Sequence, residues 1–425
     1  MTNEAAMEQV QPAASAPAPE PVVALIPRIN VAAFCDDQGT AQAMQSAGAD
    51  RRMVQAHMDV HLGGIPAAIQ AYTNAKTPDV LIIESTKQRD GLLNDLGHLA
   101  HVCDPGSKVI VIGHVNDVLL YRELVNQGIS EYIVAPIHQL QIIEHLAGMF
   151  HDPEASPVGK VLAFVGAKGG VGSSTIAHNV GWMFSKHYAT DTVITDLDMA
   201  FGTAGLNFNH EGGQGIAEAL GSMDRVDQTM LNRLLTKYSD RLSLLVAPSS
   251  IDREVEIEED ALSAVLNVVR ANVPSVIVDV PNIWTPWAKS VLVHADEVII
   301  TATPELACLR NAKNLVDLLK AARPNDNPPR LVMNQVGIPK RPEIPIAEFS
   351  KALGVEPAVT IPFDPLTFGT ASSNGQMIEE VAVKSDAARQ LVVLSQILQG
   401  QEAPPKQKGK ALGSLKAKLA TLRKK

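Results

Sequence analysis

Short apolar runs alternate with amphipathic stretches along the first third of the chain, a pattern that predicts strands alternating with helices. The apolar runs are Ile29–Phe34, Val80–Ile83, Val109–Ile112 and Tyr132–Val134, with a weaker one near Met53 and Val54. Helical periodicity lies between them, as in Ile65–Tyr72 and Leu119–Val125. Five such strands connected by helices over residues 28–150 predict a doubly wound parallel sheet.

The same alternation continues over residues 159–400 and predicts a second, larger α/β domain. Its strand-like runs are Val161–Val165, Val193–Thr195, Leu242–Pro248, Ser275–Pro281, Glu297–Thr303, Arg330–Val336 and Thr360–Asp364. Helical periodicity is found in Ile257–Val269 and Ala307–Ala321, and we expect Glu379–Leu398 to close the domain as one helix.

Three segments outside these domains differ in composition. Residues 1–27 are rich in Ala and Pro and are predicted to be disordered, while the polar residues 151–158 contain two prolines and indicate a linker. Residues 401–425 place a leucine stripe beside eight Lys and Arg residues. Such a basic amphipathic tail is typical of a segment that binds an anionic membrane surface or a partner protein, and a solvated tail is the alternative.

The net charge and the cysteine content argue against several classes of protein. The formal net charge is −10, so a general nucleic-acid binder is not expected. The three cysteines lie far apart and are odd in number, which favours a reducing compartment over a disulfide or metal framework. No apolar run approaches the roughly 20 residues of a membrane span, and the acidic N-terminus is not a secretory signal. We therefore expect a cytoplasmic protein.

The most specific chemical signal is a glycine-rich turn between a predicted strand and a predicted helix. The strand Val161–Val165 is followed by glycines at 166, 169, 170 and 172, and Ser173, Ser174 and Thr175 then open the helix. Glycines let backbone N–H groups surround phosphates, the helix N-terminus adds positive potential, and a hydroxyl of Ser174 or Thr175 can ligate Mg²⁺. A purely structural glycine turn is the alternative.

Two further strand ends carry carboxylates. Asp196 and Asp198 follow the run at Val193, and Asp279 lies near the end of Ser275–Pro281. Ligands of doubly wound sheets bind at the carboxyl ends of strands, where aspartates order a Mg²⁺ shell or an attacking water. Asp196 and Asp198 could instead cap the next helix.

The sequence Lys168-Gly-Gly-Val-Gly-Ser-Ser-Thr175 resembles the deviant Walker A loop of the ParA/MinD family, and Asp196-Leu-Asp198 and Asp279-Val-Pro281 resemble its other nucleotide-site motifs. The resemblance implies that Lys168 reaches the nucleotide of a dimer partner and that Asp198 orients water. It implies ATP binding by Gly169, Gly170, Val171, Gly172, Ser173, Ser174 and Thr175, adenine contact by Asn334, and Mg²⁺ binding by Ser174, Asp196 and Asp279. The chain departs from the family at Ser173, where a phosphate-binding lysine is usual, so fast hydrolysis is not expected.

The first domain resembles a response-regulator receiver domain. Asp36 and Asp37 match the acidic pair that would hold Mg²⁺, but Glu84 replaces the phosphoacceptor aspartate, Gly113 the usual hydroxyl residue and Ala135 the usual lysine. Aspartyl phosphorylation needs an aspartate, a metal and a lysine. We therefore predict a receiver-like fold without phosphotransfer chemistry, used for docking or dimerisation; a solvated strand end is the alternative for the acidic pair.

A receiver-like doubly wound parallel sheet followed by a deviant-Walker P-loop α/β domain resembles the CpaE/TadZ family of Flp-type (Tad) pilus assembly proteins. The resemblance implies an ATP-dependent homodimer, peripheral to the inner membrane and often at a cell pole. It would act near the pilus secretion ATPase and inner-membrane platform proteins. A ParA-type DNA- or cargo-partitioning ATPase, a phosphorylated signalling regulator and a nucleotide-independent scaffold with a degenerate P-loop are the alternatives.

Overall fold

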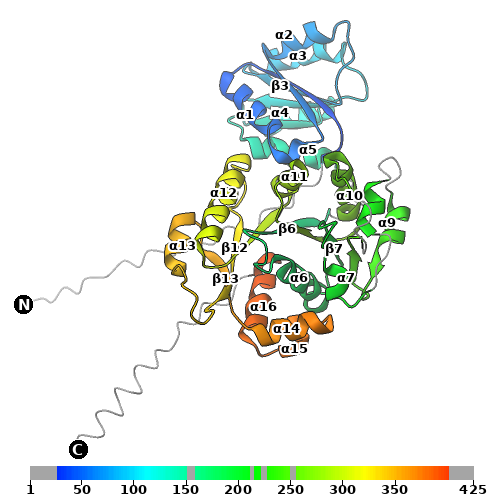
Figure 1. Cartoon of the computed structure of the whole chain (residues 1–425). Coiled ribbons are helices and arrows are strands. Elements are labelled where there is room, and N and C mark those ends of the chain that lie inside the picture. The colour runs from blue at the N-terminus through cyan, green and yellow to red at the C-terminus, as the bar shows by residue number, and fades with distance from the viewer. Residues whose placement is uncertain (1–25, 151–157, 211–214, 222–226, 249–254, 402–425) are drawn as a thin grey trace, which may run out of the picture. The chain divides into compact units, whose positions relative to one another are not determined.

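The computed structural model describes residues 26–150, 158–210, 215–221, 227–248 and 255–401, and the chain divides into two compact units, residues 1–158 and 159–425 (Figure 1). The predictions of a disordered N-terminal segment, a linker at 151–158 and a basic tail from residue 401 rest almost entirely on residues outside the described ones. No helix within the described residues is long and apolar enough to cross a membrane.

The first unit alternates strands with helices as its apolar pattern predicts. Its elements are β1 (Asn30–Cys35), α1 (Gln38–Gly48), the 3-10 helix η1 (Arg51–Met53), β2 (His57–Leu62), α2 (Gly64–Tyr72), β3 (Val80–Ser85), α3 (Arg89–Ala100), β4 (Lys108–Gly113), α4 (Val118–Asn126), β5 (Glu131–Val134) and α5 (Gln139–Phe150). The strands form a parallel sheet in the order β2-β1-β3-β4-β5. The predicted doubly wound sheet is therefore confirmed.

Alternate residues of each central strand fill two apolar layers, one on each face of this sheet. Val31, Ala33 and Cys35 pack with α1 and α5, whereas Ala32 and Phe34 pack with α2, α3 and α4. One strand prediction is wrong: Met53 lies in η1 and the second strand is β2. Since β2 is an edge strand with mostly exposed side chains, its sequence His57–Leu62 lacks an apolar run.

The second unit is larger and contains these elements: β6 (Lys160–Gly166), α6 (Ser173–His187), β7 (Thr192–Asp196), α7 (Ala204–Asn207), α8 (Gly215–Leu220), α9 (Gln228–Leu234), β8 (Thr236–Lys237), β9 (Leu242–Leu245), α10 (Glu259–Asn272), β10 (Ser275–Val280), α11 (Pro286–His294), β11 (Glu297–Ala302), α12 (Leu306–Ala322), β12 (Arg330–Val336), α13 (Ile346–Leu353), β13 (Pro357–Pro362), α14 (Pro365–Asn374), α15 (Ile378–Ala382) and α16 (Asp386–Leu398). Its sheet has the order β13-β12-β11-β6-β10-β7-β9-β8, and only the β8–β9 pair among these described strands is antiparallel.

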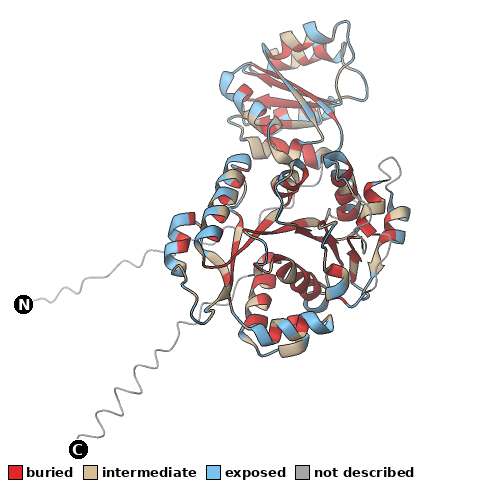
Figure 2. Ribbon diagram, viewed as in Figure 1, coloured by how far each residue is buried: buried red, intermediate tan, exposed pale blue. Residues whose placement is uncertain are grey.

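Helices cover both faces of the second sheet (Figure 1), and the central strands are buried throughout (Figure 2). Leu162 and Phe164 of β6 face a core shared with α6 and α16, whereas Ala163 and Val165 face a core shared with α10, α11 and α12. The strand β6 lies between β10 and β11, so the glycine turn that follows it is placed at the centre of the sheet's carboxyl edge.

One helix prediction needs correction. The segment predicted as one helix, Glu379–Leu398, is two helices: α15 ends at Ala382, and the hydroxyl of Ser385 caps α16 by accepting the N–H of Ala388. The helix α6 is buried around most of its circumference, because α16, α7 and the sheet enclose it. A polar residue on α6 therefore lies in the protein interior.

Candidate functional site

The glycine loop connects β6, which ends at Gly166, with α6, which begins at Ser173. Gly170 and Gly172 have φ values of +77° and +89°, in the left-handed region that favours glycine. A methyl group at Gly172 would also lie 2.6 Å from Nδ2 of Asn334. The predicted strand, turn and helix start are thus present, and Gly172 fits only without a side chain.

Amide side chains from other elements hold the loop's carbonyl groups. The bonds run from Nδ2 of Asn282 to the Gly166 oxygen (2.7 Å), Nδ2 of Asn311 to Ala167 (2.8 Å), Nε2 of Gln335 to Gly170 (3.0 Å) and Nδ2 of Asn334 to Val171 (2.7 Å). These donors fix the carbonyl oxygens, which would otherwise repel an anion.

The loop's N–H groups have no such partners. Within the described residues, no acceptor is found for the backbone N–H groups of residues 168–175. These residues line a cleft of about 1190 Å³ together with Asp198, Pro281 and the apolar Phe363 and Phe368. Unpaired N–H groups at a helix N-terminus beside an apolar wall fit the phosphates and the base of a nucleotide.

Ser173 occupies the position at which the usual Walker loop has its lysine. Its side chain is buried, and its Oγ has no hydrogen-bond partner among the described residues. Ser173 lines the cleft but brings no charge to it. Any phosphate at this loop would therefore be held by backbone N–H groups and by the cations around it.

The other lysine of the family's loop, the one expected to reach a dimer partner, is present as Lys168. Its side chain points to a carboxylate of its own chain. Its Nζ is 2.6 Å from Oε2 of Glu305, and Nη1 of Arg341 is 3.1 Å from the other oxygen of Glu305. The bond with Glu305 raises the pKa of Lys168, and the bond with Lys168 lowers the pKa of Glu305. Lys168 is thus held as a cation at the edge of the cleft.

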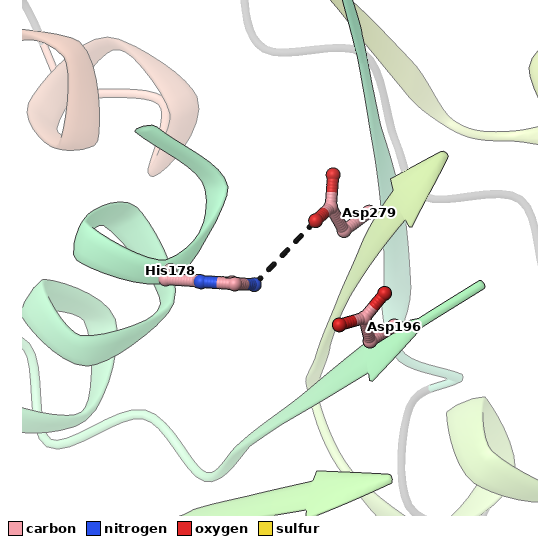
Figure 3. Close-up of side chains that lie close together, drawn as sticks. All are labelled: His178, Asp196 and Asp279. Atoms are coloured by element: carbon pink, nitrogen blue, oxygen red, sulfur yellow. Dashed lines mark ion pairs between the residues drawn. The ribbon is translucent and has the colours of Figure 1, made fainter. Parts of the chain in front are cut away.

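Below the loop, two aspartates from neighbouring strands and a histidine from α6 converge (Figure 3). Asp196 of β7 and Asp279 of β10 are register partners, and His178 points at them from the helix. Nε2 of His178 is 3.5 Å from Oδ2 of Asp279, and all three side chains are buried. Burial and the charge of Asp279 raise the pKa of Asp196 to about 6.

The remaining predicted residues are divided between two places. Gly169, Gly170, Val171, Gly172, Ser174, Thr175, Asp198 and Asn334 all line the cleft with Lys168 and Ser173. Asp196 and Asp279 lie beneath it in the interior. Asn334 is 2% exposed and its amide holds Val171, so its described contact is with the loop; adenine contact stays a prediction. Asp196 accepts the N–H groups of Asp198 and Ala204, which orders the turn after β7.

In the first unit, the phosphoacceptor position is filled by a satisfied buried carboxylate. Glu84 is 0% exposed and accepts hydrogen bonds from the N–H groups of Asp36 (2.9 Å) and Asp37 (2.8 Å) and from Oγ1 of Thr40 (2.8 Å). Nε2 of His114 lies 3.0 Å from it. Asp37 caps α1. Within the first unit's described residues these groups form a hydrogen-bonded network around Glu84, and the absence of phosphotransfer stays a prediction.

Sequence reasoning missed the residues that support the loop from a distance. His178 was not singled out, and a histidine on the helix that follows the glycine loop was the only signal available. Glu305, Arg341 and the amides of Asn282 and Asn311 come from segments whose contact with the loop depends on sheet order. Local patterns do not encode such contacts.

Comparison with known proteins relates the chain to characterised families. The sequence profile of an AAA domain matches residues 159–330. The septum site-determining protein MinD of Bacillus subtilis is 23% identical over 185 residues, which cover 42% of this chain and 66% of that protein. The chain thus spans 59% to 66% of the length of the first curated relatives it matches.

Two solved structures complete the comparison. A ParA family ATPase from Chlorobium tepidum is 26% identical with a TM-score of 0.51, over 57% of this chain and 99% of that one. The pilus assembly protein CpaE from Caulobacter crescentus is 43% identical with a TM-score of 0.30, over 30% of this chain and 98% of that one. The chain thus shares 43% identity with a pilus assembly protein CpaE over 98% of that solved chain, and the protein belongs to the CpaE family of pilus assembly proteins.

Proposed function

We propose that this chain is an assembly and localisation factor of the Flp-type (Tad) pilus machinery that binds ATP with Mg²⁺ and dimerises when ATP is bound. The cleft at the glycine loop carries the proposal, because its N–H groups are free while its carbonyl groups are held by amide donors. The negative phosphates of bound ATP would attract Lys168 of a second copy, and this contact would join the two copies. The relation to CpaE supports a role in pilus assembly, and a place at the cytoplasmic face of the inner membrane is part of the proposal.

Different residues of the cleft would bind the phosphates, the Mg²⁺ ion, the water and the base of the nucleotide. The N–H groups of the loop would hold phosphate oxygens, and Ser174, with Asp279 and Asp196 behind it, would order Mg²⁺. Asp198 would position a water, and Phe363 with Asn334 would bound the base. Because Ser173 supplies no cation, transition-state charge would be poorly neutralised, and slow hydrolysis is expected.

Features at the edge of the cleft support a second copy as the partner. Phe201 and Ile283 are 76% and 51% exposed, and both line the cleft. Exposed large apolar residues beside a ligand site mark interaction surfaces. Lys168 lies at the same edge, where exchange of Glu305 for a partner's phosphates would release it across the interface.

A nucleotide-independent scaffold is the second candidate, and Ser173 with its unpartnered hydroxyl is the observation that favours it. In that case the cleft would no longer bind a nucleotide, and the protein would act in pilus assembly only through surfaces that bind partner proteins. A DNA-partitioning ATPase is less well supported, because the chain is acidic with a formal net charge of −10.

The test is the mass of the full chain in solution by light scattering, without nucleotide, with Mg-ADP and with Mg-ATP. A monomer in the first two conditions and a dimer in the third are expected. Lys168→Ala should bind a fluorescent ATP analogue but stay monomeric, while Lys313→Ala, which removes a surface lysine on α12, should behave as wild type. The measurement is repeated without residues 402–425 to separate the tail from dimerisation.

Each result decides between the candidates. No binding of the ATP analogue at millimolar concentration would reject the proposal in favour of the scaffold. Binding without a change of mass would reject ATP-dependent dimerisation. In cells that lack the protein, wild type but not Lys168→Ala should restore pili; restoration by both would show that pilus assembly does not depend on the nucleotide-bound dimer.

A further inference from the structure

We propose that His178 ligates a divalent transition-metal ion together with Asp196 and Asp279, so that the metal site of this chain prefers Mn²⁺ or Zn²⁺ over Mg²⁺. The inference deepens the proposed function and rests on it in one respect, because the two aspartates are those assigned to the nucleotide's Mg²⁺. The histidine is the new element. Imidazole nitrogen suits Zn²⁺ and the two carboxylates suit Mn²⁺, whereas Mg²⁺ requires oxygen ligands in a near-ideal octahedron.

The arrangement of the three side chains is that of a ligand set. Each residue offers one atom, and these atoms all lie within 4.8 Å of one another (Figure 3). Nε2 of His178 and Oδ2 of Asp279 are 3.5 Å apart. With metal–ligand bonds of about 2.1 Å, this separation corresponds to an angle of about 110° at the ion, close to tetrahedral.

His178 has an unsatisfied atom aimed into this site. The residue is 0% exposed, and its Nε2 has no hydrogen-bond partner among the described residues. A buried imidazole nitrogen that faces a carboxylate without a hydrogen bond costs free energy unless something binds it. Since the distance to Asp279 is too long for a good hydrogen bond, a cation between the three groups would satisfy the nitrogen and neutralise the two carboxylates.

The other ring nitrogen has the partner that a metal-bound histidine needs. Nδ1 of His178 is 2.8 Å from the side-chain amide of Asn207 in α7. Rotation of this amide by half a turn presents its oxygen, which accepts a proton from Nδ1 and leaves Nε2 as the metal ligand. Phe208 packs beside the imidazole, with the ring centroids 5.8 Å apart, and limits its rotation.

A cavity borders the histidine. His178 and Thr175 both line a space of about 290 Å³ between α6, α7 and α14. Thr175 lines the nucleotide cleft as well, so one residue is shared by the two spaces.

The test uses the full chain, freed of metal with a chelator and without nucleotide, titrated with Mn²⁺ and followed by electron paramagnetic resonance. One Mn²⁺ per chain should bind, Zn²⁺ should displace it, and Mg²⁺ at equal concentration should not. Pulsed measurements on the bound Mn²⁺ should show coupling to a histidine nitrogen. That signal should change when the histidines are labelled with ¹⁵N, a readout that needs no variant.

Variants then assign the nitrogen. His178→Gln should weaken Mn²⁺ binding by more than about tenfold and remove the nitrogen coupling. His187→Gln is the matched control, because His187 lies on the same helix but pairs with Glu379 at its other end. It should leave both signals unchanged.

Several results would overturn the inference. They are the absence of Mn²⁺ binding at millimolar concentration, bound Mn²⁺ without nitrogen coupling, and equal affinity in His178→Gln. In any of these cases His178 serves only as a partner of the two carboxylates. Binding of the ATP analogue with Mg²⁺, measured on the same samples, separates this outcome from failure of the nucleotide site itself.

Discussion

Nζ of Lys168 lies 2.6 Å from Oε2 of Glu305, so the loop lysine is paired within its own chain. Both side chains are partly exposed, at 41% and 29%, and such pairs contribute about 1 kcal/mol or less. The pair therefore orients Lys168 without holding it strongly, and it competes with any anion that a partner offers.

Removing the competing carboxylate should favour the dimer. We predict that Glu305→Gln lowers the ATP concentration needed for half-maximal dimerisation by about fivefold, the equivalent of a pair worth about 1 kcal/mol. Light scattering across an ATP titration measures this. Asp317→Asn, which removes the Lys313 pair on α12, is the control. An unchanged or higher midpoint for Glu305→Gln would show that Lys168 does not act across the interface.

The left-handed backbone of Gly172 supports a second prediction. Gly172→Ala should weaken binding of the ATP analogue by at least about tenfold, because the methyl group is strained at this φ and displaces Asn334 from the loop. Affinity is measured by fluorescence anisotropy. Gly369→Ala in α14 has open space and ordinary φ and should bind normally. Equal affinities for both variants would mean that loop geometry does not determine binding.

The buried Asp196 predicts a dependence of stability on pH. Its folded pKa of about 6 lies above its ordinary value of 3.8, so its contribution is fully present below pH 4 and is lost as pH rises through 6. Relative to Asp196→Asn, the metal-free wild type should lose about 2 kcal/mol of unfolding free energy between pH 4.5 and 7.5. Urea unfolding over this range with chelator present measures the difference. A pH-independent difference would contradict it.

The network around Glu84 predicts where the first unit is most sensitive. Glu84→Ala should destabilise it by about 3 kcal/mol, because the N–H groups of Asp36 and Asp37 lose their buried acceptor. Hydrogen exchange of peptides from residues 28–150 measures this loss. Glu123→Ala removes a partly exposed pair with Arg89 and should change exchange little. Wild type should take up no phosphate from acetyl phosphate, and labelling at Glu84 would contradict the structural role.

Much of the fold could be predicted from the sequence, because a buried strand or helix requires apolar residues at regular positions along the chain. Central strands such as β6 and β10 are apolar on both faces, and they were found almost to the residue. The edge strand β2 was misplaced because its exposed side chains follow no apolar run. The break at Ser385 was missed because the helical periodicity continues on both sides of it.

Some residues of the candidate site could likewise be predicted from the sequence, and others could not. The loop residues from Lys168 to Thr175 were found because consecutive glycines have few other uses in a buried strand-to-helix turn. Glu305, Arg341 and His178 were not found, since their importance comes from which strands and helices become neighbours. His178 is an ordinary helix residue in sequence and becomes a candidate ligand only where β7 and β10 pair.

The four amides that hold the glycine loop come from the loop after β10, from α12 and from β12. Distortion of the loop would therefore be transmitted to both sides of the sheet, and tightening of the loop would stiffen α12 and β12 with it. A ligand of a few hundred daltons can in this way change the rigidity of surfaces well beyond its own contacts. With the proposed nucleotide bound, its presence in the cleft would in this way affect a partner that never contacts the ligand.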